Sequence, residues 1–80
     1  MPNNELIVAA LSDAEGAGRE GRDVNCPGFS NEEIKAALFY LLEKHWIRAT
    51  IVPLLSGDKR ILTHGITDLG KYELARLQAA

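Results

Sequence analysis

The residue types that perform catalysis or bind metals are few in this chain, and their spacing fits no known site. Cys26, His45 and His64 match no ligand motif, so we expect structural roles for them and no metal. Ser30 lies in a helix-capping pattern, and no serine has the strand, turn and helix context of a nucleophile elbow. The glycines of residues 16–21 precede no Gly-Lys-Ser/Thr and indicate no phosphate-binding loop. We therefore expect no enzymatic activity and no cofactor.

Basic residues are the other group that could bind a ligand. Lys59 and Arg60 follow a predicted turn, Arg48 lies on the strand predicted to face them, and Arg19 and Arg22 lie in a glycine-rich stretch. Together they could form a basic edge that contacts phosphate. The alternative is that they are solvated charges that keep an edge strand from aggregating.

Length and composition predict one ordinary folded domain covering residues 1–80. The chain is 46% hydrophobic and 25% charged, and its net charge of -2 disfavours nonspecific attraction to nucleic acid. The longest apolar runs, Leu6–Leu11 and Ala36–Leu42, fall short of the roughly 20 residues of a membrane-spanning helix, so we expect no membrane contact. The N-terminus lacks the basic region of a secretory signal, and one cysteine forms no internal disulfide. We expect a cytoplasmic protein.

The N-terminal third predicts a helix followed by a long loop. Residues 3–14 place apolar side chains on one stripe at helical spacing, with Asn3 or Asn4 as N-cap. Residues 15–28 contain four glycines and a proline and have no periodicity, which is typical of a loop. Within that loop, Asp23–Asn25 could add a short edge strand.

The second predicted helix has the strongest start signal in the chain. Ser30 and Glu33 match a capping box, and Phe29 and Ile34 match a hydrophobic staple. Apolar residues then recur at helical spacing until about His45, so one face of this helix should be buried.

After this helix the pattern changes to that of strands. Residues 47–55 and 60–63 predict a β-hairpin around a turn at 56–58, with Pro53 at an edge or bulge and Gly65 at a second irregularity. Thr67 can then cap a last helix. The predicted fold class is α+β, in the order helix, long loop, helix, hairpin, helix.

Two stretches that flank the predicted hairpin resemble winged-helix proteins. Residues 41–47, LLEKHWI, resemble the LLxxxGLI exit from the recognition helix into the wing, with His45-Trp46 in place of the usual Gly-Leu. Residues 66–74, ITDLGKYEL, are similar to the LTxxGxxxL segment that follows the wing in MarR-like, PadR-like and YjcQ-like winged-helix proteins.

The resemblance covers residues 29–77 and implies a compact winged helix whose hairpin is the wing. The second helix of the usual three-helix core should precede residue 30, but residues 15–28 have the wrong composition for it. The resemblance therefore implies a reduced variant of the fold.

The resemblance also implies a small regulator that binds double-stranded DNA as a dimer, and the hypothesis includes a phage or prophage origin. The helix from residue 31 would enter the major groove, and the hairpin tip would reach phosphate or the minor groove. The contacting residues would then be those of the helix and of the basic edge: Asn31, Lys35, Arg48, Lys59, Arg60, Arg19 and Arg22.

The alternative hypothesis is a winged-helix inhibitor or adaptor that binds a protein and not DNA. Glu32 and Glu43 lie on the solvent face of the second helix and would repel phosphate, and Lys35 is the single strong cation on that face, which has no arginine. Phe39, Tyr40 and Trp46 could serve a partner surface, because aromatic residues are enriched in interface cores. They could equally pack inside the domain, although Phe39 and Tyr40 cannot both lie on the buried face.

Overall fold

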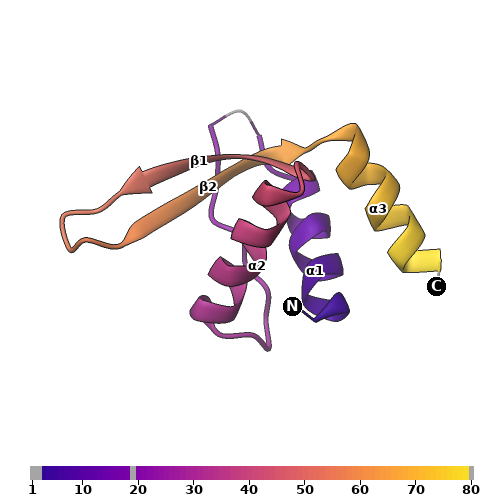
Figure 1. Ribbon diagram of the computed structural model, residues 1–80, viewed down its shortest axis with the longest axis horizontal. Coiled ribbons are helices and arrows are strands. Elements are labelled where there is room, and N and C mark those ends of the chain that lie inside the picture. The colour runs from indigo at the N-terminus through magenta and orange to yellow at the C-terminus, as the bar shows by residue number, and fades with distance from the viewer. Residues whose placement is uncertain (1–2, 19, 80) are drawn as a thin grey trace.

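The computed structural model describes residues 3–18 and 20–79, which form three helices and one two-stranded antiparallel hairpin. The elements are α1 (Asn4–Glu15), α2 (Asn31–Glu43), β1 (Ile47–Pro53), β2 (Lys59–Ile66) and α3 (Asp68–Ala79), as Figure 1 shows. The α+β class and the predicted order of elements are confirmed. In the described part of the chain, no helix is both long and apolar enough to cross a bilayer.

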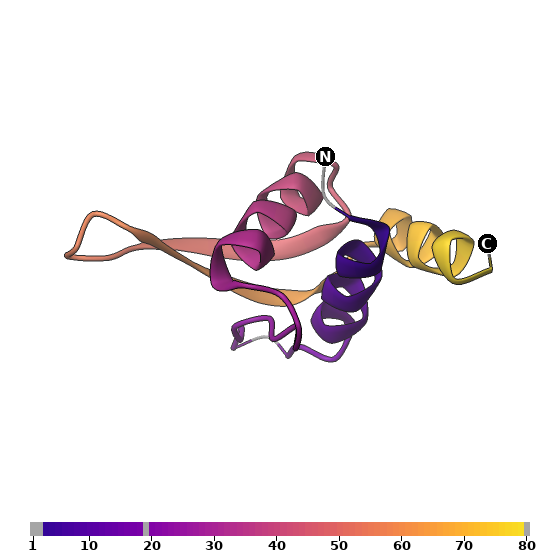
Figure 2. The ribbon, with the colours of Figure 1, turned by 90° about the horizontal axis from the view of Figure 1, so that it is seen from below.

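The hairpin runs along the length of the molecule, and its far end projects beyond the helices (Figures 1 and 2). α1 packs against α2, α3 and β2, and a single cluster of buried apolar side chains lies between them. α1 supplies a full stripe to this core, as its spacing predicts, whereas α3 buries little beyond Gly70 and Leu74. The stripe from α1 consists of Leu6, Ile7, Ala10, Leu11 and Ala14.

The predicted helix starts are confirmed. The Asn3 side chain accepts a hydrogen bond from the backbone N–H of Glu5 at 2.7 Å. Ser30 and Glu33 form the capping box, each side chain bonding the other residue's backbone N–H at 3.1 Å. These contacts satisfy N–H groups that the first turn of a helix leaves without partners.

α2 ends in a tight reversal centred on His45. The backbone N–H of His45 bonds the carbonyl of Leu42 at 3.0 Å, and that of Trp46 bonds the carbonyl of Leu41 at 2.9 Å. These two bonds are those of a Schellman motif. The motif needs a left-handed backbone at the residue directly after the C-cap. His45 fills that position with φ of 62°, a conformation that favours glycine.

We predict that His45→Gly raises the free energy of unfolding. A left-handed backbone costs a side-chain-bearing residue about 1–2 kcal/mol, and glycine's greater freedom in the unfolded chain offsets part of that gain, leaving a net increase of about 0.5–1 kcal/mol. Urea unfolding followed by circular dichroism would measure it. His45→Ala should not stabilise the chain, and equal stability of both variants would contradict the backbone argument.

The hairpin is uneven, as Pro53 and Gly65 predict. Ile47 pairs with Ile66, but the register shifts between Arg48 and Ala49, where β2 carries an extra residue. Pro53 is the last residue of β1. The short strand expected at residues 23–25 is not formed, because the loop meets β2 one residue earlier, in an isolated antiparallel bridge between Arg22 and Thr63.

α3 is fixed to the end of α2 by the segment that resembles winged-helix proteins. The Thr67 hydroxyl donates to the carbonyl of His45 at 2.6 Å and accepts from the backbone N–H of Gly70 at 3.0 Å, which caps the helix. Gly70 is buried against the backbone of Trp46, and a Cβ atom at residue 70 would lie 2.0 Å from the Trp46 carbonyl oxygen. Leu74 then reaches the core.

We predict that Gly70→Ala lowers the free energy of unfolding by about 2 kcal/mol or more, because the clash is with backbone and cannot be relieved by a rotamer change. Urea unfolding would measure the loss. Gly18→Ala is the matched control, since a Cβ there meets nothing within 4 Å. Equal effects of the two substitutions would contradict the close packing at Trp46.

Candidate functional site

The solvent face of α2 is an acidic ridge with one aromatic residue. Glu32, Ala36, Phe39 and Glu43 are all exposed and lie at helical spacing, so they share one side of the helix. Phe39 is 37% exposed although it is a large apolar side chain. The face that would have to enter a DNA groove therefore carries two exposed carboxylates, and Lys35, one turn before Phe39, is half-buried and paired with Asp58.

An apolar groove lies beside this ridge, between the start of α1 and the length of α2. It has a volume of about 640 Å³. We call it the α1–α2 groove, and its lining residues are Asn3, Leu6, Glu33, Ala36, Phe39, Tyr40 and Glu43. Its apolar side chains come from both helices, and its two charged groups, Glu33 and Glu43, are both acids. Such a groove suits a ligand with apolar groups and positive charge.

Aromatic packing fixes one wall of the α1–α2 groove. The rings of Tyr40 and Trp46 meet edge to face, with centroids 5.9 Å apart, and the ammonium of Lys44 lies 5.6 Å from the Tyr40 ring centroid. Tyr40 and Trp46 are half-buried and pack against the core, whereas Phe39 is the exposed member of the predicted aromatic set. Tyr40 is therefore held in place, and Phe39 is available to a partner.

A second cleft, of about 450 Å³, lies between α2, the hairpin and the loop before α2. We call it the hairpin cleft. Four of the predicted nucleic-acid contacts line it together: Asn31, Lys35, Lys59 and Arg60. The sequence prediction thus grouped residues that do meet in space, although they come from two distant segments of the chain.

Two of these four residues are engaged by acids. Arg60 donates two hydrogen bonds to the carboxylate of Asp23, at 3.0 and 2.7 Å, and the Lys35 ammonium pairs with the Asp58 carboxylate at 2.5 Å. These pairs tie the hairpin to the loop and to α2. They also neutralise charge that a phosphate contact would require.

The ion pairs shift the acids in the expected direction. The hydrogen bond from Arg60 holds the pKa of Asp23 below its ordinary value of 3.8, against a smaller effect of desolvation. The hydrogen bond from Lys35, helped by the backbone N–H of Lys59, likewise lowers the pKa of Asp58. Because both pKa values are lower in the folded state, each pair stabilises the fold above the unfolded-state pKa. That stabilisation is lost as the pH falls through the folded-state pKa.

We predict that Arg60→Ala raises the pKa of Asp23 toward its ordinary value and leaves that of Asp58 unchanged, because each carboxylate has its own cation. Side-chain carboxyl shifts followed by NMR between pH 2 and about 6 would report both. Arg48→Ala is the control and should move neither value. An unchanged pKa of Asp23 in Arg60→Ala would show that the pair does not persist in solution.

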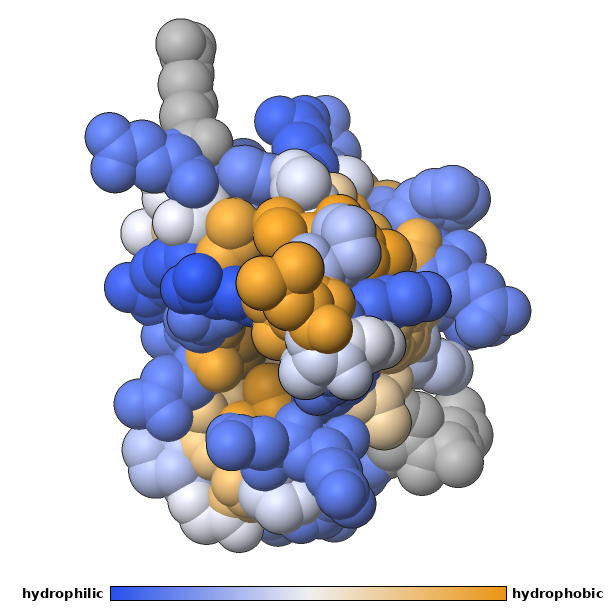
Figure 3. All heavy atoms as spheres, turned by 90° about the vertical axis from the view of Figure 1, so that its left-hand side faces the viewer, coloured by the Kyte–Doolittle hydropathy of each residue, from blue (hydrophilic) through white to orange (hydrophobic). Residues whose placement is uncertain are grey.

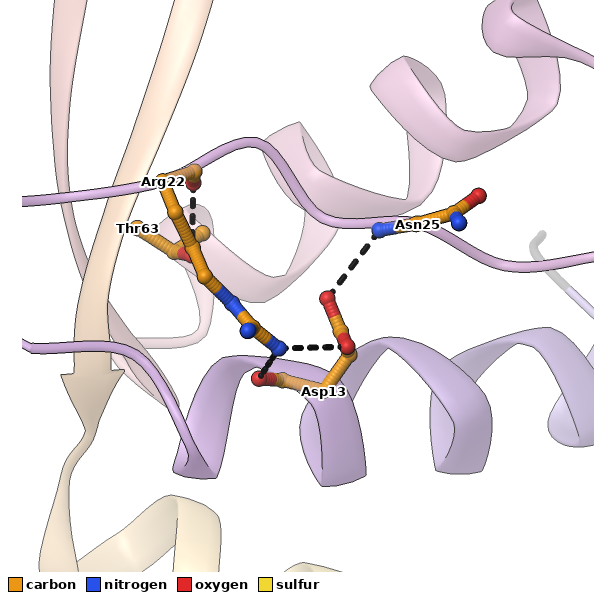
Figure 4. A network of polar contacts seen from close by, with 4 residues as sticks. All are labelled: Asp13, Arg22, Asn25 and Thr63. Carbon is orange, nitrogen blue, oxygen red and sulfur yellow. Dashed lines mark hydrogen bonds and ion pairs between the residues drawn. The ribbon is translucent and has the colours of Figure 1, made fainter.

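Arg22 is also engaged, in a network that fastens the long loop to the fold (Figure 4). Its guanidinium donates to the side chain and the carbonyl of Asp13, at 2.6 and 3.0 Å. The same carboxylate accepts from the backbone N–H of Asn25 at 3.0 Å, and the Thr63 hydroxyl donates to the Arg22 carbonyl at 3.1 Å. Arg22 thus has a structural role, whatever else it contacts.

The remaining predicted cations are placed differently. Arg48 is exposed on β1, and Lys59 is exposed at the start of β2; neither has an acidic partner within residues 3–18 and 20–79. Arg19 lies outside the described residues. Two cations on the hairpin are therefore available to an anionic ligand.

The end of the hairpin carries a feature that the sequence analysis missed. Ile51 and Leu54 are more than 40% exposed, and Leu55 is fully exposed. We call these three residues the apolar tip. Seen from the hairpin end, apolar surface fills the centre of the view and hydrophilic residues surround it (Figure 3). The signal in the sequence was a pair of leucines directly before Ser-Gly-Asp, where a turn usually carries polar residues.

Cys26 is fully buried, and desolvation, with the charge of Asp13 adding to it, raises the pKa of its thiol. The thiol is therefore protonated and unreactive at neutral pH. The Nε2 atom of His64 lies 2.8 Å from the Thr50 hydroxyl oxygen. Within the described residues, no three potential metal-binding side chains come together.

Comparison with protein-family models, curated proteins and solved structures finds no match to this chain.

Proposed function

We propose that this chain is a reduced winged-helix domain that binds a protein segment in the α1–α2 groove. The winged-helix assignment is supported by the order of α2, the hairpin and α3, and by the backbone reversal after α2. It is supported further by the roles of Thr67 and Gly70, which match the resemblance in position. Under this assignment, α2 corresponds to the recognition helix and the hairpin corresponds to the wing.

The observation that carries the proposal is the chemistry of the exposed side of α2. A helix that reads DNA presents arginine, lysine, asparagine or glutamine to base edges. Here Glu32, Phe39 and Glu43 occupy the exposed ridge, and an apolar groove lies beside them. The complementary ligand is an extended or helical segment with apolar anchors flanked by lysine or arginine.

The apolar part of the groove supplies affinity, and the acids supply orientation. Phe39 is 37% exposed, so completing its burial contributes about a third of the value for a fully exposed side chain, roughly 0.5–1 kcal/mol. Rim charges such as Glu43 act mainly on the association rate and on the choice of partner. Because Tyr40 is already held by Trp46, the groove loses little conformational freedom on binding.

A second candidate function is that of a dimeric regulator that binds DNA. The positions of Arg48 and Lys59 favour this function. Arg48 and Lys59 are exposed on a hairpin that projects from the body, where a wing would meet phosphate. The pairing of Lys35 and Arg60 with acids leaves this surface with few free charges. We therefore place it behind the protein-binding function.

The test is a titration of the labelled protein with a helical peptide built from leucine and lysine. We expect shifts of backbone amide resonances that map to the α1–α2 groove, with a Kd in the micromolar range, roughly 10–100 µM. Ala36→Glu places a charge on the groove wall without touching the core and should weaken binding at least tenfold, whereas Ala75→Glu on α3 should not. A peptide with serine replacing leucine is the control for charge alone.

Duplex DNA in a mobility-shift assay separates the two functions. We expect no shift at micromolar protein and low salt. A robust shift that weakens steeply with salt, and that is lost when Lys59 and Arg60 are both replaced by alanine, would overturn the protein-binding proposal in favour of DNA.

A further inference from the structure

We propose that the apolar tip of one copy of this chain docks in the α1–α2 groove of a second copy. The inference rests on the proposed function, since it names one occupant of the same groove. Tip and groove share no residue, because the tip belongs to the hairpin and the groove to α1 and α2. One molecule can therefore offer both surfaces at once, and the contact is head to tail.

The exposure of the apolar tip is the first argument. Leu55 is fully exposed and Leu54 is 42% exposed, and Ile51 lies on the adjoining strand. Leucines gathered at the end of a projecting element lose their contact with water only when another molecule covers them. The groove offers an apolar counterpart, with Leu6, Ala36 and Phe39 on its walls.

The rigidity of the tip is the second argument. The backbone N–H of Leu54 bonds the carbonyl of Asp58 at 2.8 Å, and that of Gly57 bonds the carbonyl of Leu54 at 3.0 Å. The Asp58 carboxylate is held in turn by Lys35 of α2. A tip that is already ordered gives up little conformational entropy when it docks, which favours it over a disordered peptide of the same composition.

Charge complementarity is the third argument, and it selects a second copy as the occupant. Lys59 lies opposite Pro53 at the base of the tip and has no acidic partner within the described residues. The groove carries Glu33 and Glu43, and Glu32 lies on the ridge beside it. The tip thus has the composition that the groove requires, apolar residues next to an uncompensated cation.

The contact predicts a defined assembly behaviour. If each of two molecules places its tip in the other's groove, they form a closed dimer. If each tip enters the groove of a different molecule, the same contact produces short chains of molecules. We expect the mass from light scattering to rise from the monomer value of 8.8 kDa to twice that or more as protein concentration increases. The rise should fall between about 10 µM and about 1 mM.

Two single substitutions test which surfaces meet. Leu55→Glu disrupts the tip and Ala36→Glu disrupts the groove, and each variant alone should stay at the monomer mass over the whole concentration range. Leu69→Glu is the matched control, because Leu69 is an exposed leucine on α3, outside tip and groove, and this variant should associate as the unmodified chain does. Circular dichroism would confirm that all three variants are folded.

Mixing the two disrupted variants is the decisive measurement. The intact tip of Ala36→Glu can enter the intact groove of Leu55→Glu, so the mixture should regain a one-to-one complex that neither variant forms alone. A mixture that stays monomeric while the unmodified chain associates would overturn the head-to-tail contact. An unmodified chain that remains monomeric at about 1 mM would overturn the inference as a whole.

The outcomes for the two proposals are separable. A monomeric chain that still binds the leucine-lysine peptide in its groove contradicts the self-association and leaves the protein-binding function standing. A groove that binds neither the peptide nor the tip contradicts both.

Discussion

The backbone of Trp46 is the point on which the arrangement of α2, the hairpin and α3 depends. Its carbonyl oxygen accepts from the backbone N–H of Thr67 at 3.0 Å and lies against Gly70, while its own N–H closes the end of α2 on Leu41. Three elements therefore meet at the backbone of one residue, and their angles are set there together. Any side chain at residue 70 would push α3 away, so glycine at this position is a requirement of packing.

The helix starts could be predicted from the sequence because their causes are local. A capping residue and its partner are three positions apart, so Ser30 with Glu33 and Thr67 with Gly70 are visible without a structure. The end of α2 could be placed only approximately. His45 adopts the left-handed conformation without being glycine, and tertiary contacts, here the bond from the Thr67 hydroxyl to the His45 carbonyl, help to hold it.

The candidate site was harder to predict because the ion pairs that shape it join residues that are distant in the sequence. Arg60 and Asp23 are 37 positions apart, and Lys35 and Asp58 are 23 apart. Listing cations on the sequence suggested a set of phosphate contacts, but these pairs engage two of its members, Arg60 and Lys35, in contacts within the fold. The groove was missed for a similar reason: periodicity shows which residues of α2 face away from the core, but not that α1 leaves space beside them.

The long loop contributes to the hydrophobic core directly. Val24 and Cys26 are both buried and belong to the core cluster. The backbone of Arg22 exchanges two hydrogen bonds with Thr63 of β2, at 3.0 and 2.9 Å, so the loop binds the hairpin as a short strand would. The carboxylate of Asp13 joins the same loop to α1. On one flank of α2 the hairpin cleft holds the ion pairs of Lys35 with Asp58 and of Arg60 with Asp23, so these two cations serve the fold. The opposite flank, toward the start of α1, keeps its apolar groove open, and the side chains that line this groove are therefore available to a partner.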